Sequence, residues 1–339
     1  RYNYDKTEEQ KCEEVYAGIT TLVAFLIVSP LSITVGEEVI GGVIPTTYMG
    51  SQGMFVALIL CYLVAKVYCK ILSSKLKIRL PDSVPPMVSS SFESLIPVII
   101  TLVLVCSINY CFTLTSFGNI HALVNEIIQK PLLLIGTGLP ALLISQGLAQ
   151  LLWFFGLHGD QIVGSVMDPI LQTAGMENLS AYTAGDAVPY IITDQFRALF
   201  VMIAFMSLVI AILIVSKSNR LKGVGKVAVL PATFCISEPV VFGAPVVMNA
   251  MLFIPWVLSR PVFGLITWLF MKFGLCPYPT GVAIPWTTPP VLSGFLATNS
   301  IMGAVVQIIC LAIGVLMFIP FVKMIDKTYH QEEIKTKEQ

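Results

Sequence analysis

The stretch QLLWFFGLHGDQIVG, residues 150–164, ends a long apolar run with a histidine and an aspartate that stand beside glycines. No charged residue occurs between Leu132 and Leu157, so the run can cross a bilayer as a helix, which takes about 20 mostly apolar residues. The whole chain has only three histidines. An apolar helix that ends in His158 and Asp160 predicts a membrane segment whose end meets a polar ligand.

Composition extends the membrane interpretation to the whole chain. Of the 339 residues, 56% are hydrophobic and 12% are charged, whereas an ordinary soluble domain is about one quarter charged. The formal net charge of zero gives no indication of nucleic-acid binding. We therefore expect an all-α protein that crosses the bilayer several times.

Apolar runs alternate with broken segments along the chain. The runs of spanning length cover residues 15–31, 53–72, 95–117, 132–157, 196–216, 250–272 and 301–322. The segments that proline and glycine interrupt are 160–195, 227–249 and 277–300. Non-helical backbone at membrane depth is tolerated only inside the protein or around a cavity, so the broken segments indicate a transport site.

Clusters of lysine and arginine predict which loops are cytoplasmic. They lie at 66–79, 217–226 and 323–337. Three clear runs separate the first two clusters, and an odd number would place these clusters on opposite sides. We expect one further crossing, or a misread span, between 158 and 195. Residues 73–92 predict an interfacial segment, and residues 326–339 predict a charged, solvated tail.

Two ionisable side chains stand out, because a charge within a membrane region is costly unless it is paired or hydrated. His158 follows an apolar run, and Glu238 stands between apolar flanks just before a proline, which predicts extended backbone. Both are candidate ligands for a substrate. The alternatives are that His158 caps a helix or bonds a carbonyl, and that Glu238 pairs with Arg260 or Arg197 for structure alone.

The remaining acidic residues and the tryptophans receive different interpretations. Tryptophan gathers at membrane interfaces, which favours that place for Trp256 and Trp268. Trp153 stands five residues before His158, and Trp286 stands within the broken segment 277–300. In either place an aromatic face can pack on a sugar ring. Arg197 is most simply an interface anchor. The carboxylates interpreted as loop or helix-cap residues are Asp160, Asp168, Glu177, Asp186 and Asp194.

The sequence offers no metal or cofactor motif. It has no phosphate-binding loop, no GxSxG or HExxH motif, and no zinc-ligand spacing. The eight cysteines form no CxxC pair, and most lie within apolar runs, where a thiol behaves as a small hydrophobic group. We expect neither a metal site nor a cofactor.

Four motifs in order resemble the membrane component IIC of the bacterial sugar phosphotransferase system, in its lactose, cellobiose and diacetylchitobiose branch. They are SVPPMVSSSFESLIP (83–97), LLWFFGLHGDQIVGSVMDPI (151–170), CISEPVVFGAPVVMN (235–249) and AIPWTTPP (283–290). Members have ten spanning helices, two re-entrant hairpins and a homodimeric assembly in the cytoplasmic membrane. The resemblance implies that this chain begins after the second span, so that about eight spans remain.

The resemblance also implies an arrangement of parts. Residues 1–131 would form the scaffold and dimerisation part. Residues 132–325 would form the sugar-transport domain, which moves between outward-facing and inward-facing positions in an elevator mechanism. The re-entrant hairpins would account for the broken segments after His158 and before Asn249.

The site residues of the family carry over to matching positions. The histidine of GLHG and the glutamate of EP, here His158 and Glu238, would bind the sugar near its 6-hydroxyl. Trp153 and Trp286 would flank the sugar rings. Gly159 and Asn249 would also contact the substrate. Glu93 lies in a family motif without an assigned role.

The expected chemistry is transfer of a phosphoryl group to the sugar. A phosphocysteine of the partner component IIB would be the donor, and Glu238 would orient the 6-hydroxyl and accept its proton. His158 would hold the same hydroxyl or stabilise phosphoryl charge. Two alternatives stay open: a proton-coupled secondary sugar transporter, since both residues titrate, and a sugar sensor that does not transport.

Overall fold

The structure is a computed structural model that describes residues 14–35, 38–74, 76–78, 80–81, 84–244 and 246–337. Lys75 and Arg79 of the first basic cluster, and the last two residues of the predicted tail, lie outside the described residues. The chain divides into two compact units, Arg1–Pro131 and Leu132–Gln339. This division by contacts does not test the roles predicted for the parts 1–131 and 132–325, which stay predictions.

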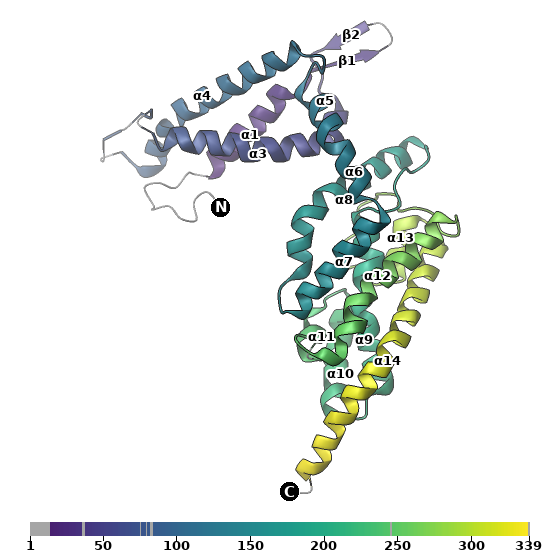
Figure 1. Ribbon diagram of the computed structural model, residues 1–339. Coiled ribbons are helices and arrows are strands. Elements are labelled where there is room, and N and C mark those ends of the chain that lie inside the picture. Colours follow the sequence, from purple (N-terminus) through teal and green to yellow (C-terminus); the bar gives the residue numbers. More distant parts are fainter. Residues whose placement is uncertain are drawn as a thin grey trace. The chain divides into compact units, whose positions relative to one another are not determined.

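The first unit is a group of helices with one small hairpin (Figure 1). Its elements are α1 (Glu14–Val28), β1 (Ser32–Val35), β2 (Glu38–Gly41), α2 (Thr46–Met49), α3 (Ser51–Leu72), α4 (Pro86–Thr113), α5 (Ile120–Val124), the π-helical turn η2 (Asn125–Gln129) and the first residues of α6 (Lys130–Gly136). Helix α1 packs against both α3 and α4. Buried Ala17, Tyr68 and Cys69 form a core there. The antiparallel β1–β2 hairpin, with Ile33 opposite Ile40, departs from a purely helical fold.

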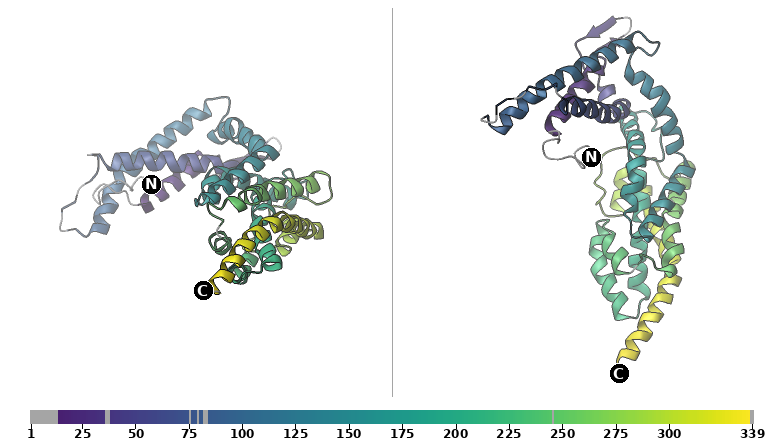
Figure 2. Two further views of the ribbon diagram at one scale, coloured as in Figure 1. Left: turned by 60° about the horizontal axis from the view of Figure 1, so that its bottom comes forward. Right: turned by 60° about the vertical axis from the view of Figure 1, so that its left-hand side comes forward.

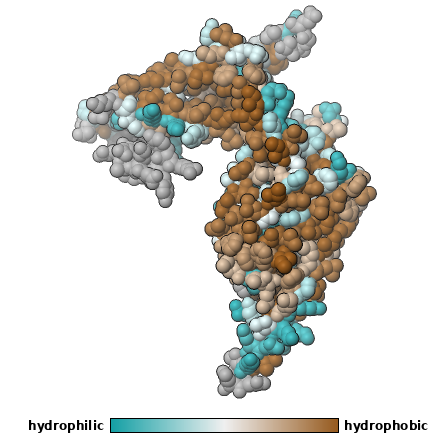
Figure 3. Space-filling model, in the orientation of Figure 1, coloured by the Kyte–Doolittle hydropathy of each residue, from teal (hydrophilic) through white to brown (hydrophobic). Residues whose placement is uncertain are grey.

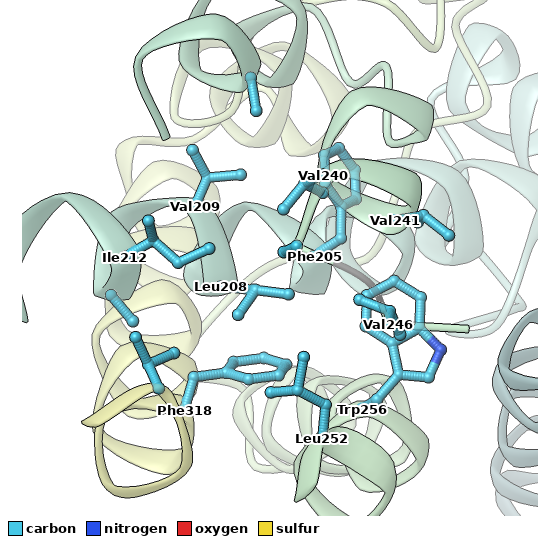
Figure 4. Close-up of a cluster of buried hydrophobic side chains, with 14 of the residues drawn as sticks. Phe205, Leu208, Val209, Ile212, Val240, Val241, Val246, Leu252, Trp256 and Phe318 are labelled. Atoms are coloured by element: carbon cyan, nitrogen blue, oxygen red, sulfur yellow. The ribbon is translucent and has the colours of Figure 1, made fainter. Parts of the chain in front are cut away.

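The second unit is a bundle in which α12 lies between α7 and α14, while α9 packs on α14 and α10 (Figures 1 and 2). Its elements are α7 (Leu139–Phe154), α8 (Gly159–Ala184), η3 (Phe196–Val201), η4 (Met202–Ala204), α9 (Phe205–Val215), α10 (Asn219–Thr233), α11 (Glu238–Gly243), α12 (Ala250–Lys272), α13 (Leu292–Thr298) and α14 (Ile301–Lys337). Figure 4 shows side chains of α9, α11, α12 and α14 converging in one core, with Leu208, Val240, Trp256 and Phe318 among them.

Small residues let helices of this unit approach closely, as is usual in membrane bundles. A Cβ atom on Gly303 of α14 would lie 2.1 Å from the carbonyl oxygen of Gly294 in α13. A Cβ atom on Gly314 would lie 2.3 Å from the hydroxyl of Ser207 in α9. Alanine at either position would therefore force the helices apart.

In the part of the chain that the structure describes, five helices are long and apolar enough to cross a membrane: Gly53–Leu72, Val88–Thr113, Phe196–Val215, Ala250–Lys272 and Ile301–Lys335. A bent pair, Ile120–Gly136 with Leu139–Phe154, brings the number among the described residues to six if it counts as one span. Figure 3 shows apolar side chains over most of the visible surface of these helices, and polar ones around the C-terminal end of α14. The predicted membrane-protein class and its helical character agree with this structure.

Three predicted spans differ in the structure. The run 15–31 forms the helix Glu14–Val28, whose 15 described residues are fewer than the spanning helices have. The run 132–157 is interrupted between Gly136 and Leu139, because Thr137 and Gly138 end one helix and Pro140 begins the next in its first turn, where a proline loses no hydrogen bond. The third span begins near Val88 rather than at 95, so the last part of the predicted interfacial segment 73–92 belongs to α4.

The prediction of irregular backbone directly after His158 was wrong, because residues 159–184 form the continuous helix α8. Pro169 removes one backbone hydrogen bond, but the buried face of the helix, with Val163, Leu171 and Ala174, outweighs this local preference through packing. Non-helical backbone begins after Gly185, whose φ is 79°.

Asn178 satisfies part of that non-helical backbone. Its amide nitrogen donates to the carbonyl oxygens of Tyr190 and Pro279, both at 2.8 Å, and its oxygen accepts from the Tyr190 nitrogen at 2.9 Å. The side chain is fully buried on α8. A single asparagine thus joins the connections 186–195 and 273–291 and satisfies groups that a membrane interior would leave without partners.

The predicted solvated tail is largely a continuation of α14, which runs to Lys337. Asp326, 4% exposed, accepts hydrogen bonds from the backbone nitrogens of Lys217 and Ser218 at 2.7 and 2.9 Å. Glu333 accepts from the backbone nitrogens of Asn219 and Arg220. The two carboxylates therefore satisfy the free N–H groups at the start of α10 and fasten it to α14.

Candidate functional site

A cavity of about 360 Å³ lies within the second unit. Its walls come from the α7–α8 corner, the segment from η3 to α9, the α10–α11 connection, α12 and the segment before α13. The residues that line it are Trp153, His158, Asp160, Gln161, Ala198, Met202, Phe205, Cys235, Ser237, Glu238, Arg260 and Trp286. Four of the six predicted site residues, from three separate sequence motifs, thus meet around one cavity.

His158 has two roles in the structure. It is the N-cap of α8, where its Nδ1 accepts a hydrogen bond from the backbone nitrogen of Gln161 at 3.3 Å. Its ring also packs on Trp153, with 4.5 Å between the ring centroids. The capping alternative is therefore observed together with a place in the cavity wall. Because Nδ1 accepts, the proton of the neutral ring lies on Nε2, which remains a donor.

Trp153 is 3% exposed and is held by a carboxylate. Its Nε1 donates to Oδ2 of Asp160 at 2.9 Å. The same carboxylate forms an ion pair with Arg260, through Oδ1 to Nη1 and through Oδ2 to Nη2 at 3.0 Å. Arg260 on α12, Asp160 on α8 and Trp153 on α7 therefore form one connected network, and His158 packs on its last member.

Glu238 is exposed to the cavity and is the first residue of the short helix α11. The expectation of extended backbone at Glu238 was wrong: a proline in the first turn of a helix needs no N–H partner, so Pro239 permits the helix to begin here. Cys235, with φ of 62°, makes the tight turn that precedes it. The connection delivers the carboxylate to the cavity wall.

The structure does not show the alternative in which Glu238 pairs with an arginine. Arg260 pairs with Asp160, and Arg197 pairs with Asp168. Within the described ranges, Glu238 forms neither an ion pair nor a hydrogen bond through its side chain. Its oxygens are therefore available to a ligand, and this supports the binding hypothesis over the structural alternative.

Trp286 lies in the non-helical segment before α13 and is 57% exposed. The Sγ of Cys235 donates to the carbonyl oxygen of Thr288 at 3.7 Å, which brings this segment beside the turn before Glu238. A half-exposed indole at a cavity wall presents an apolar ring face to whatever enters.

Gly159 and Asn249 are not among the residues that line the cavity. Gly159 is buried where α7 and α8 meet, and a Cβ atom on it would lie 1.9 Å from the carbonyl oxygen of Ala149. Asn249 is the N-cap of α12, and its Oδ1 accepts from the backbone nitrogen of Met251 at 3.1 Å. Both residues have structural roles in this state, and their contact with a substrate stays a prediction.

Sequence reasoning missed the ionic part of the site. Asp160 and Asp168 were interpreted as loop or cap residues, yet both form ion pairs, and Arg197 is a buried partner rather than an interface anchor. Trp256 is 1% exposed and donates to the carbonyl oxygen of Gln150, so its predicted place at the membrane interface was wrong. An arginine in the middle of the apolar run 250–272 was the signal that could have revealed Arg260.

The charges of the cavity are few. Arg260 contributes one positive charge, while Asp160 and Glu238 contribute one negative charge each, in a wall that is otherwise apolar or neutral. Among the described residues, no three His, Cys, Asp or Glu side chains gather in a way that could hold a metal ion. Two indoles, an imidazole and a free carboxylate suit a neutral polyhydroxylated ligand, since aromatic faces pack on C–H groups and the polar groups bind hydroxyls.

Known proteins match this chain over nearly its full length. The family model for the phosphotransferase system EIIC component matches residues 11–259. The oligo-beta-mannoside-specific EIIC component of Bacillus subtilis (strain 168) is 42% identical over 330 residues, which are 96% of this chain and 75% of that relative. The cellobiose-specific EIIC component of Geobacillus stearothermophilus is 37% identical and covers 97% of this chain and 76% of its own.

A solved structure agrees with the fold as well. The transporter ChbC, the IIC component from the N,N'-diacetylchitobiose-specific phosphotransferase system, superposes with a TM-score of 0.92 at 36% identity, covering 96% of this chain and 78% of that one. The resemblance predicted from four motifs is thereby confirmed. This chain belongs to the EIIC family of the phosphotransferase system, the family of integral cytoplasmic-membrane components that carry sugar.

Proposed function

We propose that this permease carries a β-linked disaccharide through the cavity of the second unit and presents the sugar's 6-hydroxyl to component IIB for phosphorylation. The observation that carries the proposal is that Trp153, Trp286, His158 and Glu238 line one cavity. Its volume of about 360 Å³ lies in the range of small-molecule sites, about 300–1,000 Å³.

The cavity side chains divide the work of binding. The ring face of Trp286, which is 57% exposed, packs on the apolar C–H face of a sugar ring, while Trp153, which is 3% exposed and carries the His158 ring, flanks the sugar as part of the cavity wall. The Nε2–H of His158 donates to a sugar oxygen, because its Nδ1 is already occupied by the backbone of Gln161. Glu238 accepts from the 6-hydroxyl, because its carboxylate has no protein partner among the described residues.

The proposed phosphoryl step uses the same side chains. The 6-hydroxyl oxygen attacks the phosphorus of a phosphocysteine on IIB, the P–O bond forms, the S–P bond breaks, and the thiolate stays on IIB. Glu238 takes the hydroxyl proton. Positioning and electrostatic stabilisation dominate such transfers, which is what fixed side chains in a largely apolar cavity provide.

The rest of the chain receives roles consistent with this proposal. Residues 1–131 serve as the scaffold and dimerisation part of a homodimer. Residues 132–325 move the sugar between the two faces of the membrane. The compactness of each unit by itself supports such a division of labour.

The sugar is a β-linked disaccharide of the cellobiose, diacetylchitobiose or lactose type. The matched relatives named above are specific for oligo-beta-mannosides, cellobiose and diacetylchitobiose. Membership of the EIIC family favours this function over a proton-coupled secondary transporter and over a sugar sensor.

Equilibrium binding of radiolabelled cellobiose, diacetylchitobiose and lactose to the purified protein tests the proposal. We expect one of them to bind and Glu238→Gln to weaken its binding by about 10-fold or more, since hydrogen bonds to charged groups contribute about 1.5–3 kcal/mol. Glu126→Gln is the matched control, because Glu126 is an exposed partner of Lys130 in the first unit. If no disaccharide binds the folded wild-type protein, the proposed substrate class is wrong.

A further inference from the structure

Arg260 is the one lysine or arginine among the described residues that line the cavity. It lies on α12, whose buried face includes Trp256 and Phe263, and its side chain is 2% exposed. Neutral sugar hydroxyls do not require a buried cation, and such a charge is costly in a membrane protein. Its place beside the proposed reaction centre calls for a chemical reason.

The guanidinium of Arg260 has more donors than its protein partner uses. It carries five N–H groups, and the two oxygens of Asp160 accept from Nη1 and Nη2. The Nε–H is buried and has no acceptor among the described residues, and the same holds for the Nε–H of Arg197. A buried donor without a partner is unfavourable, and of the two arginines only Arg260 lines the cavity, where a ligand can supply acceptors to its unused N–H groups.

We propose that Arg260 binds the phosphoryl group during its transfer to the sugar, with Asp160 holding the guanidinium in place. The inference rests on the proposed function. As the S–P bond of the phosphocysteine breaks and the P–O6 bond forms, negative charge spreads over the three non-bridging oxygens of the phosphoryl group. The unused N–H groups of Arg260 donate to those oxygens, while the hydroxyl proton goes to Glu238.

Asp160 explains why the arginine does not trap the product. It already compensates one positive charge, so the finished phosphosugar meets a cavity in which Arg260 and Asp160 cancel, and Glu238 repels the phosphosugar once the proton that it took has left. A fixed guanidinium can stabilise charge as it forms without retaining the product as strongly as a free cation would. Asp160 is therefore a positioning residue for both Arg260 and the indole of Trp153.

The test compares two Asp–Arg pairs that start from the same helix. The double variant Asp160→Asn/Arg260→Gln removes the charged pair of the cavity without leaving a lone buried charge. The control, Asp168→Asn/Arg197→Gln, removes the other pair of α8, whose residues do not line the cavity. For each protein, disaccharide affinity and the single-turnover rate of transfer from phosphorylated IIB at saturating disaccharide are measured.

We expect the transfer rate at saturating sugar to fall at least 100-fold in the cavity variant, beyond any change in sugar affinity, and to stay within about 3-fold of wild type in the control. Arginines that contact a transferring phosphoryl group contribute about 10³–10⁵ in other enzymes. An unchanged rate at saturation would overturn the inference. So would a folded variant that binds no sugar, because the pair would then serve sugar binding.

A single variant keeps the test decisive if the double variant does not fold. Arg260→Lys retains the charge opposite Asp160 but loses the planar fork and its extra donors. Its transfer rate at saturation should fall by at least 10-fold, and a wild-type rate would contradict the role assigned to Arg260. If the wild-type protein binds sugar yet accepts no phosphoryl group from IIB, the proposed function fails, which is a different result from either of these.

Discussion

The two sides of the cavity differ in how their side chains are held. On the α7–α8 side, Trp153 is buried and bonded to Asp160, and His158 caps a helix. On the side formed by the α10–α11 connection and the segment before α13, Glu238 is exposed without a side-chain partner among the described residues, and Trp286 is 57% exposed. The first side is fixed by the protein, whereas the second has groups whose partners must come from a ligand.

This difference predicts that substitutions on the two sides separate stability from binding. On the fixed side, a change breaks bonds that the folded protein already has. On the open side, a change removes bonds that form only with substrate. Measurements of unfolding and of disaccharide affinity on the same variants can therefore support or contradict the comparison.

Asp160→Ala should have the largest effect on stability. It leaves the buried guanidinium of Arg260 without its anion and the Nε1–H of Trp153 without its acceptor. Removal of one partner of a buried ion pair costs about 3–5 kcal/mol. We expect a clear fall in the thermal unfolding temperature of the detergent-solubilised protein. Asp168→Ala is the matched control and should cost less, because Asp168 is 37% exposed and water can partly replace it.

Glu238→Ala should show the opposite pattern. Since the carboxylate has no side-chain partner among the described residues, we expect the free energy of unfolding to change by no more than about 0.5 kcal/mol. Disaccharide affinity should fall by about 10–100-fold, because a charged acceptor of sugar hydroxyls is lost. A large loss of stability with unchanged affinity would mean that this side of the cavity is as structural as the other.

Local sequence was enough to identify four residues that line the cavity. His158, Glu238, Trp153 and Trp286 each stand out against apolar or broken surroundings within a few positions. The pairing of Asp160 with Arg260 joins residues 100 positions apart, and only the packing of α8 against its neighbours determines it. The sequence alone could therefore not show that Asp160 and Arg260 form a pair.

The wrong local predictions share a physical cause. Trp256 was placed at the membrane interface from its residue type, yet tertiary packing buries it against the backbone of Gln150. Pro169 and Pro239 suggested broken or extended backbone, yet one lies inside a helix and the other in a first turn. In each case packing, or a position where the missing N–H costs nothing, outweighed the intrinsic preference of one residue.

The two tryptophans give the smallest and sharpest form of the comparison. Phenylalanine keeps an aromatic face but removes the indole N–H. In Trp153→Phe the Asp160 oxygen loses a donor within a buried network, so we expect a cost of about 1 kcal/mol in unfolding and a weakening of sugar binding of a few-fold. In Trp286→Phe no hydrogen bond among the described residues is lost, so unfolding should not change. Sugar affinity should fall only slightly, because the smaller phenylalanine ring covers less of the sugar. Equal unfolding costs for both variants would contradict a fixed side and an open side, because they would mean that the cavity holds both indoles in the same way.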